Sequence, residues 1–452
     1  MASFNLPPEL LAIITSLSNT ETLKALRLTN HMLCAFATKN LFSTVSLYTE
    51  DQSCEGFESV ITHPQLNEHV HKVRLNTVKV DYSSDEEHEE LEVPFKWKEL
   101  LPMLPKIPNL ESVVLRFDKT ITFDDDYQHP PQSVDYRESL IRWLGAGLVS
   151  LKQPLKELGI QNHQNMTPLN PDLQQVLCTL SSLRLNVVHE TEPSCIQNEI
   201  EKEAFQDFYG RILPSIWLKP MMGSLRKLSL YSNFPWGFYP KFSLEGIHCP
   251  NLQSLTLGNF CFFEDQQVDW ILSHSSTLEQ LYLDDCLIFF RARILDNEGQ
   301  LAMCPIPKSR MEFQPGYSWW DFWHYDYPSR WSDLFASFKT GLPHLRRFAI
   351  GHNRAWDADP EYEIPFEKEL DLVPALMHDR YMAFEGGLVE GHLGPSQFIS
   401  PGWNEAGDWP QCDDEDREAL KTLYGKIKQQ VDCGEFTVGD RKVVDLVETR
   451  PW

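Results

Sequence analysis

The stretch "LRKLSLYSN", residues 225–233, places aliphatic residues at its first, fourth and sixth positions and closes on a polar residue. The same hexad recurs as "LQSLTL" 27 residues later and as "LEQLYL" after a further 26 residues. Other copies are "VHKVRL" from Val70, "LESVVL" from Leu110, "LKELGI" from Leu155, "LSSLRL" from Leu180 and, with Phe at the fourth position, "LRRFAI" from Leu345. An apolar pattern that returns in this way predicts a stack of similar structural units.

Three of the hexads are followed by a residue suited to closing the turn after a strand. Asn233, Cys286 and Asn353 each lie three places beyond the last aliphatic residue of their hexad. Hexads with this closing residue resemble leucine-rich repeats, in which each hexad supplies one strand of a shared parallel sheet. The sequence therefore predicts an α/β fold, an irregular leucine-rich-repeat solenoid with a horseshoe-shaped parallel sheet. Ordinary amphipathic strands from unrelated sheets are the alternative interpretation.

Composition narrows the classes of protein that the chain can represent. With 452 residues, of which 42% are hydrophobic, it can bury a large core. We expect neither a membrane span nor a secretory signal, because no suitable apolar run is present. The net charge of −25 disfavours binding of nucleic acid or an anionic membrane by the whole surface. The ten cysteines are scattered, so we expect reduced thiols in the cytoplasm or the nucleus.

The first 50 residues differ from the rest, because they carry three acidic and three basic residues and therefore none of the excess negative charge. In "LPPELLAIITSL", residues 6–17, the apolar spacing predicts a helix that begins at a proline pair. Ser18 and Glu21 then have the spacing of a capping box for a second helix. A third helix is predicted in "HMLCAFATKNLF", followed by a strand in "STVSL". The hexad "LKALRL" from Leu23 lies among these helix signals and is excluded from the repeats.

The leucine-proline opening, the apolar first helix, "ETLKALRLTN" and "LFSTVSL" together resemble the F-box, over residues 4 to 47. Later stretches are similar to fungal-type F-box proteins with degenerate leucine-rich repeats: "CPNLQSLTLGNF", "WILSHSSTLEQLYLDDC", "RWSDLFASFKTGLPHLRRFAIG" and "DRYMAFEGG". The resemblance implies a three-helix module that docks onto the Skp-type adaptor of a cullin-RING ubiquitin ligase. It also implies the adaptor contacts, which are Leu6, Pro7, Leu10, Leu11, Ile14, Leu23, Leu26 and Arg27.

This organisation predicts three parts: an F-box at 1–50, an irregular repeat domain at 51–355, and a C-terminal extension with loops and a terminal helix at 356–452. Insertions are expected at 81–92, which is an acidic loop, and at 287–335. The second insertion contains nine aromatic residues between 313 and 331. They predict either a satellite core or an exposed stacking platform. The segment 412–430 is acidic at its start and basic near its end, which is typical of a surface helix.

The third, fifth and seventh positions of each hexad are expected to face solvent on the concave side of the sheet, because side chains alternate along a strand. These positions carry six basic and two acidic residues on a chain of net charge −25. The hypothesis is that they bind an acidic or phosphorylated segment of a substrate protein. The predicted substrate-binding residues are Lys72, Arg74, Arg116, Arg184, Lys227, Tyr231, Tyr282 and Arg347.

No catalytic or phosphate-binding motif is found in the sequence, so we expect a non-catalytic receptor subunit without metal or cofactor. Its expected partners are the Skp-type adaptor, a cullin reached through that adaptor, and an unknown substrate protein. One alternative is a repeat-based scaffold outside any ligase, in which the N-terminal helices only cap the repeat core. A further alternative is a carbohydrate- or ligand-binding protein that uses the aromatic insertion through Trp319 and Trp320.

Overall fold

The computed structural model describes residues 6–78, 91–119, 131–166, 170–189, 206–238, 240–315, 321–353, 372–385, 397–399 and 409–430. The chain forms two compact units, which are taken separately below. Unit 1 holds residues 1–118, 123–161 and 168–180, and unit 2 holds 119–122, 162–167 and 181–452. The predicted domain boundaries after residues 50 and 355 stay predictions. No helix in the described ranges is long and apolar enough to cross a membrane.

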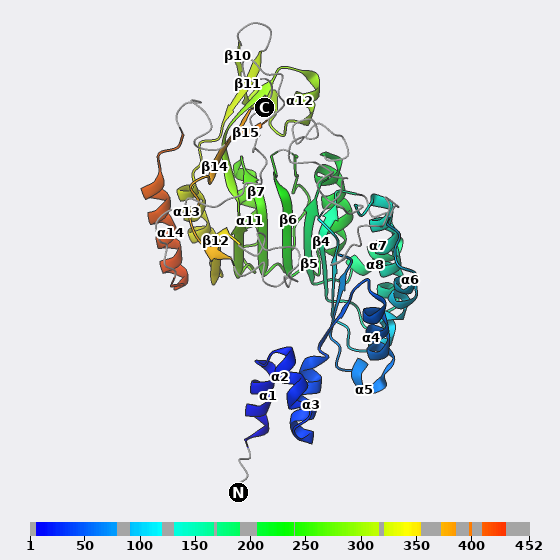
Figure 1. The fold of residues 1–452 in the computed structure, drawn as a ribbon. Helices are drawn as coiled ribbons and strands as arrows, with labels where there is room; N and C mark the ends of the chain where they lie inside the picture. The colour runs from blue at the N-terminus through cyan, green and yellow to red at the C-terminus, as the bar shows by residue number, and fades with distance from the viewer. Residues whose placement is uncertain are drawn as a thin grey trace, which may run out of the picture. The chain divides into compact units, whose positions relative to one another are not determined.

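Unit 1 begins with three short helices, labelled in Figure 1: α1 (Pro8–Ser16), α2 (Thr20–Leu26) and α3 (His31–Leu41). All three were predicted, but the cap of α2 differs. Asn19 accepts the Thr22 N–H at 2.9 Å, whereas the Ser18 hydroxyl donates to the Ile14 carbonyl of α1. Asn is as good a cap as Ser, and here it lies one residue nearer to the helix.

The repeat strands of unit 1 form a parallel sheet in sequence order: β1 (Thr44–Leu47), β2 (Lys72–Asn76), β3 (Ser112–Arg116) and β4 (Glu157–Gln164). The connections contain α4 (Asp51–Thr62), α5 (Pro64–Asn67), α6 (Phe95–Leu100), the 3-10 segment η1 (Leu101–Lys106), α7 (Val134–Val149) and α8 (Pro171–Leu177). Helix α7 packs against both η1 and α8. These crossovers bury the aliphatic residues of the hexads, as parallel sheets require.

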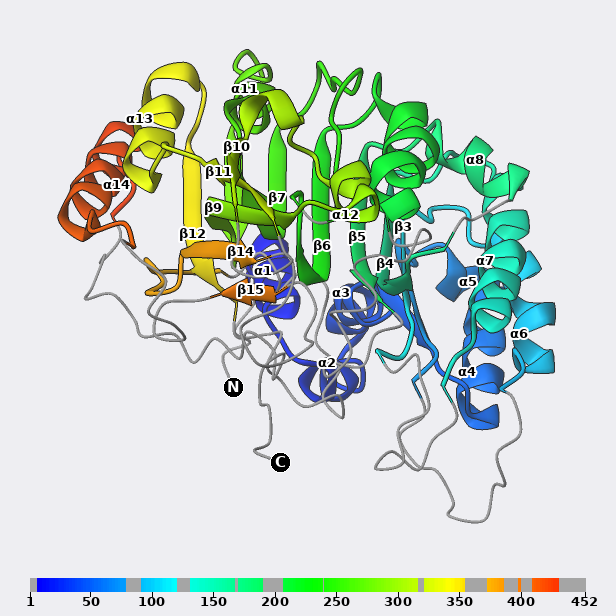
Figure 2. The ribbon, with the colours of Figure 1, turned by 90° about the horizontal axis from the view of Figure 1, so that it is seen from above.

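Unit 2 continues the pattern with β5 (Ser182–Val188), β6 (Lys227–Trp236), β7 (Ser254–Phe262), β8 (Gln280–Asp284) and β12 (Arg347–His352), which pair in that order and in parallel. The strand β13 (Val373–Pro374) pairs in antiparallel with the last two residues of β12, Gly351 and His352. Between them lie η2 (Phe208–Leu218), η3 (Lys219–Met221), α11 (Asp265–Leu272) and α13 (Trp331–Gly341). Figure 2 shows α11 and α13 on one face of these strands.

All eight repeat hexads begin two residues before a strand, from β2 through β8 and then β12. The fourth and sixth residues of each are buried, as in Leu228 and Leu230 of β6. The predicted parallel repeat sheet is therefore confirmed within each unit, and the excluded hexad from Leu23 lies in α2. The horseshoe shape stays a prediction.

A second sheet grows from the insertion that was expected at 287–335. Its central strand β9 (Leu287–Leu295) pairs in antiparallel with β11 (Phe322–Asp326) and in parallel with β14 (Tyr381–Glu385), while its first residues pair with the end of β7. The outer strands are β10 (Glu312–Gln314) and β15 (Gln397–Ile399). Helix α12 (Glu298–Met303) and the 3-10 turn η4 (Lys308–Arg310) lie between β9 and β10. The predicted end of the insertion, residue 335, falls inside α13, which belongs to the repeats.

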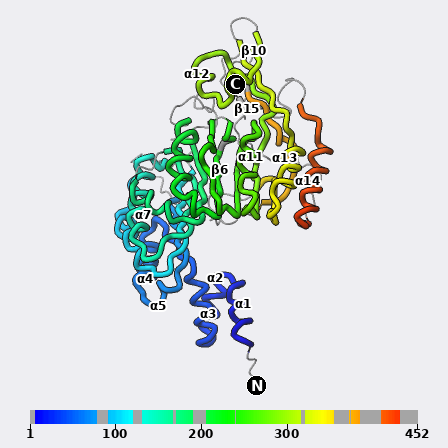
Figure 3. Tube along the Cα trace, turned by 180° about the vertical axis from the view of Figure 1, so that it is seen from behind, coloured from blue at the N-terminus to red at the C-terminus, as the bar shows by residue number. Residues whose placement is uncertain are grey.

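The terminal helix α14 (Asp413–Ile427) packs beside α13, as Figure 3 shows from behind. It was expected to be a surface helix, and one face of it is buried, with Asp416, Leu420, Leu423 and Tyr424. Just after it, the Gln429 side-chain amide accepts the Phe348 N–H at 3.0 Å and donates to the Phe348 carbonyl at 2.8 Å. Gln429 thus satisfies backbone groups of β12 that would otherwise form an open sheet edge.

Candidate functional site

The predicted adaptor contacts on α1 form an exposed apolar surface. Leu6 is 41% exposed, Leu10 46% and Ile14 44%, and Pro7 is also exposed. Leu11 on the same helix and Leu26 on α2 are half-buried. Large aliphatic side chains that stay this exposed on neighbouring turns of a helix are typical of an interaction surface.

Two predicted contacts on α2 have an internal role instead. Leu23 is the buried residue of this helix. Arg27 donates from Nε to the Thr38 hydroxyl at 3.1 Å, and its guanidinium lies 5.2 Å from the centre of the Phe42 ring. A second bond joins α3 to α1, from Asn40 Nδ2 to Thr15 Oγ1 at 3.0 Å. These contacts pack the three helices together, so the exposed apolar residues lie on a folded group of helices.

Four further apolar residues of this helical group are exposed and were not among the predicted contacts: Ile13, Leu17, Leu28 and Met32. Ile13 and Leu17 could have been found, because they share the helical spacing of Leu10 and Ile14. Leu28 follows α2 in a turn, where helical periodicity gives no signal. We call the seven residues Leu6, Leu10, Ile13, Ile14, Leu17, Leu28 and Met32 the apolar surface.

The predicted substrate residues of unit 1 are half-buried on adjacent strands. Lys72 and Arg74 lie on β2 and Arg116 on β3, where it pairs in register with Asn76. Lys72 Nζ lies 3.7 Å from Glu157 Oε1, and the Ser112 hydroxyl donates to the same oxygen at 2.8 Å. The charge of Lys72 is therefore partly balanced within the sheet.

The predicted substrate residues of unit 2 divide into two sets. Lys227 and Arg347 are exposed at the amino ends of β6 and β12. Arg184, Tyr231 and Tyr282 lie further along their strands and are buried. We expected these three to face solvent, and in this respect the structure differs. Their role in substrate binding stays a prediction.

Neighbouring side chains explain the burial of the two tyrosines. The Tyr231 ring lies against Gly258, which is its partner in register on β7. Tyr282 packs in a cluster with Ala349 and with Leu372, which is distant in sequence. Burial raises the pKa of the Tyr282 hydroxyl, against the opposing effect of the Arg347 charge.

Gly258→Ala is expected to destabilise unit 2 by about 1–3 kcal/mol, because the added carbon forces a well-packed ring to move. A Cβ at this position would lie 2.0 Å from Tyr231 Cδ1. Urea unfolding followed by circular dichroism measures the change. Gly223→Ala is the matched control, since a Cβ there meets nothing within 4 Å. Equal effects of the two substitutions would show that Tyr231 does not pack against Gly258.

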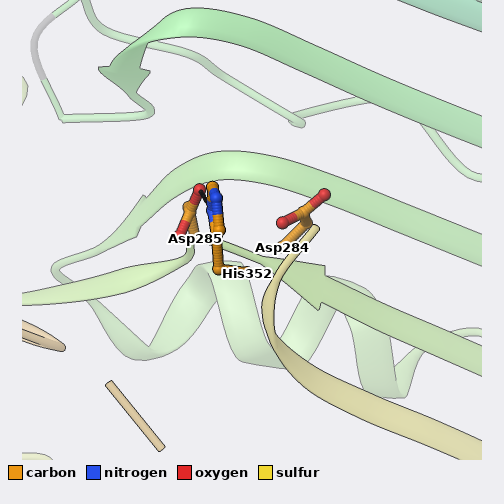
Figure 4. A group of neighbouring side chains, drawn as sticks. All are labelled: Asp284, Asp285 and His352. Atoms are coloured by element: carbon orange, nitrogen blue, oxygen red, sulfur yellow. Dashed lines mark hydrogen bonds and ion pairs between the residues drawn. The ribbon is translucent and has the colours of Figure 1, made fainter. Parts of the chain in front are cut away.

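A cluster of Asp284, Asp285 and His352 lies where β8 and β12 end, and their possible ligand atoms are within 4.8 Å of one another. Figure 4 shows Asp285 beside His352, with the Asp284 carboxylate apart from that pair. Asp285 Oδ2 lies 2.6 Å from His352 Nδ1, and Asp284 Oδ1 accepts the Asn353 N–H at 2.9 Å. These bonds join the turns that follow β8 and β12.

The described aromatic residues of the insertion mostly face inward. Phe322, Tyr325, Tyr327 and Trp331 are buried, which agrees with a satellite core. At the surface, Phe313 contacts Trp323, and the Trp323 Nε1 donates to Asp296 at 2.9 Å. Trp319 and Trp320, which carry the ligand-binding alternative, lie outside the described residues, as does most of the acidic insertion 81–92.

Comparison with known proteins gives little further constraint. No family model matches the chain, and no curated protein matches it. Among solved structures, the chain is similar to a leucine-rich-repeat protein of Leptospira interrogans, with 13% identity and a TM-score of 0.17, over 64% of this chain and 79% of the other. A likeness this low has no bearing on function. The fold description therefore stands on the parallel strand pairing of the chain itself.

Proposed function

We propose that the chain is a non-catalytic substrate receptor of a cullin-RING ubiquitin ligase. In this proposal α1–α3 dock onto a Skp-type adaptor and the repeats bind a target protein. The resemblance of residues 4 to 47 to the F-box supports the first part. Binding the target beside the conjugating machinery would raise its effective concentration there, which needs no chemistry from this chain.

One observation carries the proposal: the apolar surface itself. Of the ten large hydrophobic side chains that are exposed in the described ranges, seven belong to it, and they lie within 27 residues, from 6 to 32. A helical group that only capped the repeat core would present a polar outer face to solvent. An apolar outer face instead suits a partner that covers it, and the F-box resemblance identifies that partner as the adaptor.

Leu10→Asp combined with Ile14→Asp is expected to weaken adaptor binding by about 100-fold or more, because two apolar anchors at the centre of the contact become charged. Both side chains are exposed, so the helices should still fold. The measurement is capture of purified variant chains on immobilised Skp-type adaptor, with circular dichroism as the check of folding.

Phe95→Asp is the matched control, because Phe95 is an exposed hydrophobic residue of unit 1 outside the apolar surface, at the start of α6. It should bind the adaptor like the unchanged chain. If the double variant were captured as well as the control, the apolar surface would not be the docking site. If the unchanged chain were not captured at all, the scaffold alternative would replace the ligase.

A further inference from the structure

The amino ends of the unit 2 strands carry a concentration of positive charge on an acidic protein. Lys227 is the first residue of β6 and Arg347 the first residue of β12. Arg226 and Arg346 directly precede them, and Lys428 follows α14. All five side chains are exposed. Lys428 belongs to this group because its neighbour Gln429 is bonded to the Phe348 backbone. We call these five residues the basic rim.

The rim contains little compensating negative charge. Glu279, at the residue before β8, lies 3.6 Å from Arg346, in a pair whose arginine is 77% exposed. Such an exposed pair contributes little. Within the described part of the chain, Lys227 has no ion-pair partner, and Arg347 lies 5.9 Å from the centre of the Tyr282 ring. The rim is thus a positive surface on a chain whose net charge is −25.

Strand register places two of these cations in one row. Lys227 pairs with Ser254, Ser254 with Gln280, and Gln280 with Arg347. Each of the four is the third residue of its hexad, so their side chains point to the same face. Lys227 and Arg347 are exposed there, Gln280 is half-buried and Ser254 is buried. Three strand spacings separate Lys227 from Arg347, which is about 14 Å.

The middle of the row offers one kind of hydrogen-bond donor, the side-chain amino group of Gln280. The Ser254 hydroxyl donates to Gln280 Oε1 at 3.4 Å, and the Tyr282 hydroxyl donates to the same oxygen at 3.2 Å. Both bonds use the carbonyl of the Gln280 side chain, so its amino group remains to donate to a ligand. From Lys227 through Gln280 to Arg347, the row therefore offers donors without an acidic side chain. Groups that only accept hydrogen bonds, such as carboxylates and phosphates, complement it.

We propose that this row binds an extended protein segment with two acidic or phosphorylated residues about four positions apart. Successive residues of an extended chain advance by about 3.3 Å, so four of them match the distance between the two cations. A short segment carries few charges, whereas a long polyanion such as nucleic acid would be repelled by the rest of this acidic chain. The inference rests on the proposed function, since it names the class of target that the repeats would take.

Fluorescence anisotropy with short labelled peptides tests the proposal without any adaptor. Three peptides share one neutral extended sequence and carry glutamate, phosphoserine or glutamine at positions two and six. A fourth carries its two phosphoserines side by side. We expect both acidic peptides to bind, the phosphoserine peptide more tightly, and the glutamine peptide not to bind. The peptide with adjacent phosphoserines should bind at least about tenfold more weakly than its spaced counterpart.

Lys227→Glu with Arg347→Glu is expected to weaken peptide binding by about tenfold or more, through loss of two charge-assisted contacts and repulsion by the new carboxylates. Lys227→Gln with Arg347→Gln should give a smaller loss in the same direction. The matched control is Arg142→Glu with Lys241→Glu, which makes the same change of net charge at exposed positions that are not members of the row.

Three outcomes would overturn the proposal: no binding of either acidic peptide, equal loss in the control variant, or tighter binding of a single-stranded oligonucleotide of equal charge. Capture on the Skp-type adaptor is measured on the same samples. Adaptor capture without peptide binding would remove this inference and leave the proposed function standing. Peptide binding without adaptor capture would remove the proposed role in a ligase and leave the peptide-binding row standing.

Discussion

Asp416→Ala is expected to lower the free energy of unfolding of unit 2 by about 3–5 kcal/mol, because it leaves a buried arginine without its buried partner. The Asp416 side chain is fully buried, and the Arg380 side chain is only 4% exposed. Arg380 Nε donates to Asp416 Oδ2 at 2.9 Å. Urea unfolding followed by tryptophan fluorescence measures the loss, since Trp331 lies beside this pair.

The same carboxylate also joins α14 to the start of α13. Asp416 Oδ1 accepts the Ser332 N–H at 2.8 Å, and Oδ2 accepts the Tyr381 hydroxyl at 2.8 Å. The Tyr381 oxygen in turn accepts the Trp331 N–H. Two of the first amides of α13 are thereby satisfied at the end of the helix where a negative charge is favourable. Burial and the nearby Asp416 charge both raise the pKa of the Tyr381 hydroxyl.

Asp414→Ala is the matched control for this prediction. Asp414 lies in the same first turn of α14, but its side chain is 96% exposed, and its pair with Arg417 is a surface contact. Its loss should be below about 1 kcal/mol. A double variant, Arg380→Leu with Asp416→Leu, should lose less than the sum of the two single changes. Equal effects of Asp416→Ala and Asp414→Ala would show that α14 is not held by the buried pair.

Acidification from pH 7 to pH 5 is expected to remove about 4 kcal/mol from the free energy of unfolding, through two buried histidines. Burial lowers the pKa of His274 to about 4 and that of His189 to about 3, from an ordinary value of 6.5. Above pH 6.5 both histidines are neutral whether the chain is folded or unfolded. Below it, the unfolded chain binds protons that the folded chain excludes, so stability falls by about 1.4 kcal/mol per pH unit for each histidine.

Each of these buried histidines has a hydrogen-bond partner at both ring nitrogens, although burial is what lowers its pKa. His274 Nδ1 donates to the Trp270 carbonyl and its Nε2 accepts the Cys249 N–H, beside the stacked ring of His248. His189 Nδ1 lies 2.6 Å from Asn233 Oδ1, and its Nε2 lies 3.0 Å from the Tyr209 hydroxyl. Asn233 was predicted from the sequence to close a repeat turn, and this bond shows how its side chain is used.

Urea unfolding at a series of pH values between 7 and 5 measures the histidine effect. His274→Gln should reduce the slope by the contribution of one histidine, which is about 1.4 kcal/mol per pH unit. A free energy of unfolding that stays constant over this range would contradict the prediction.

The repeat sheet could be predicted because its signal is local. A hexad fixes both the start of a strand and the residues that face the core, as "LRKLSL" does for β6. The second sheet could not be predicted in this way. Its strands β9 and β14 are far apart in the sequence, and no local pattern indicates that they pair. Contacts between distant segments also explain why the burial of Tyr282 was not predicted. Tyr282 is covered by Leu372, which lies 90 residues further along the chain, and no sequence period reports such a contact.

The sequence predicted the exposure of some candidate site residues correctly and that of others wrongly. The F-box resemblance implied Leu10, Ile14 and Leu23 alike as contacts, and it could not tell the two exposed residues from Leu23, which packs inward. Alternation along the strands identified Lys227 and Arg347. It could not show that, of the predicted residues in unit 2, only these two stay exposed, because that depends on the segments that cover the sheet.

Amide hydrogen exchange on the chain with and without purified Skp-type adaptor tests the central claim most directly. The claim predicts slower exchange in the adaptor complex within residues 6–32, where the apolar surface lies, and unchanged exchange in β5–β8 and β12. No slowing within residues 6–32, or slowing confined to the repeat strands, would contradict docking through the N-terminal helices.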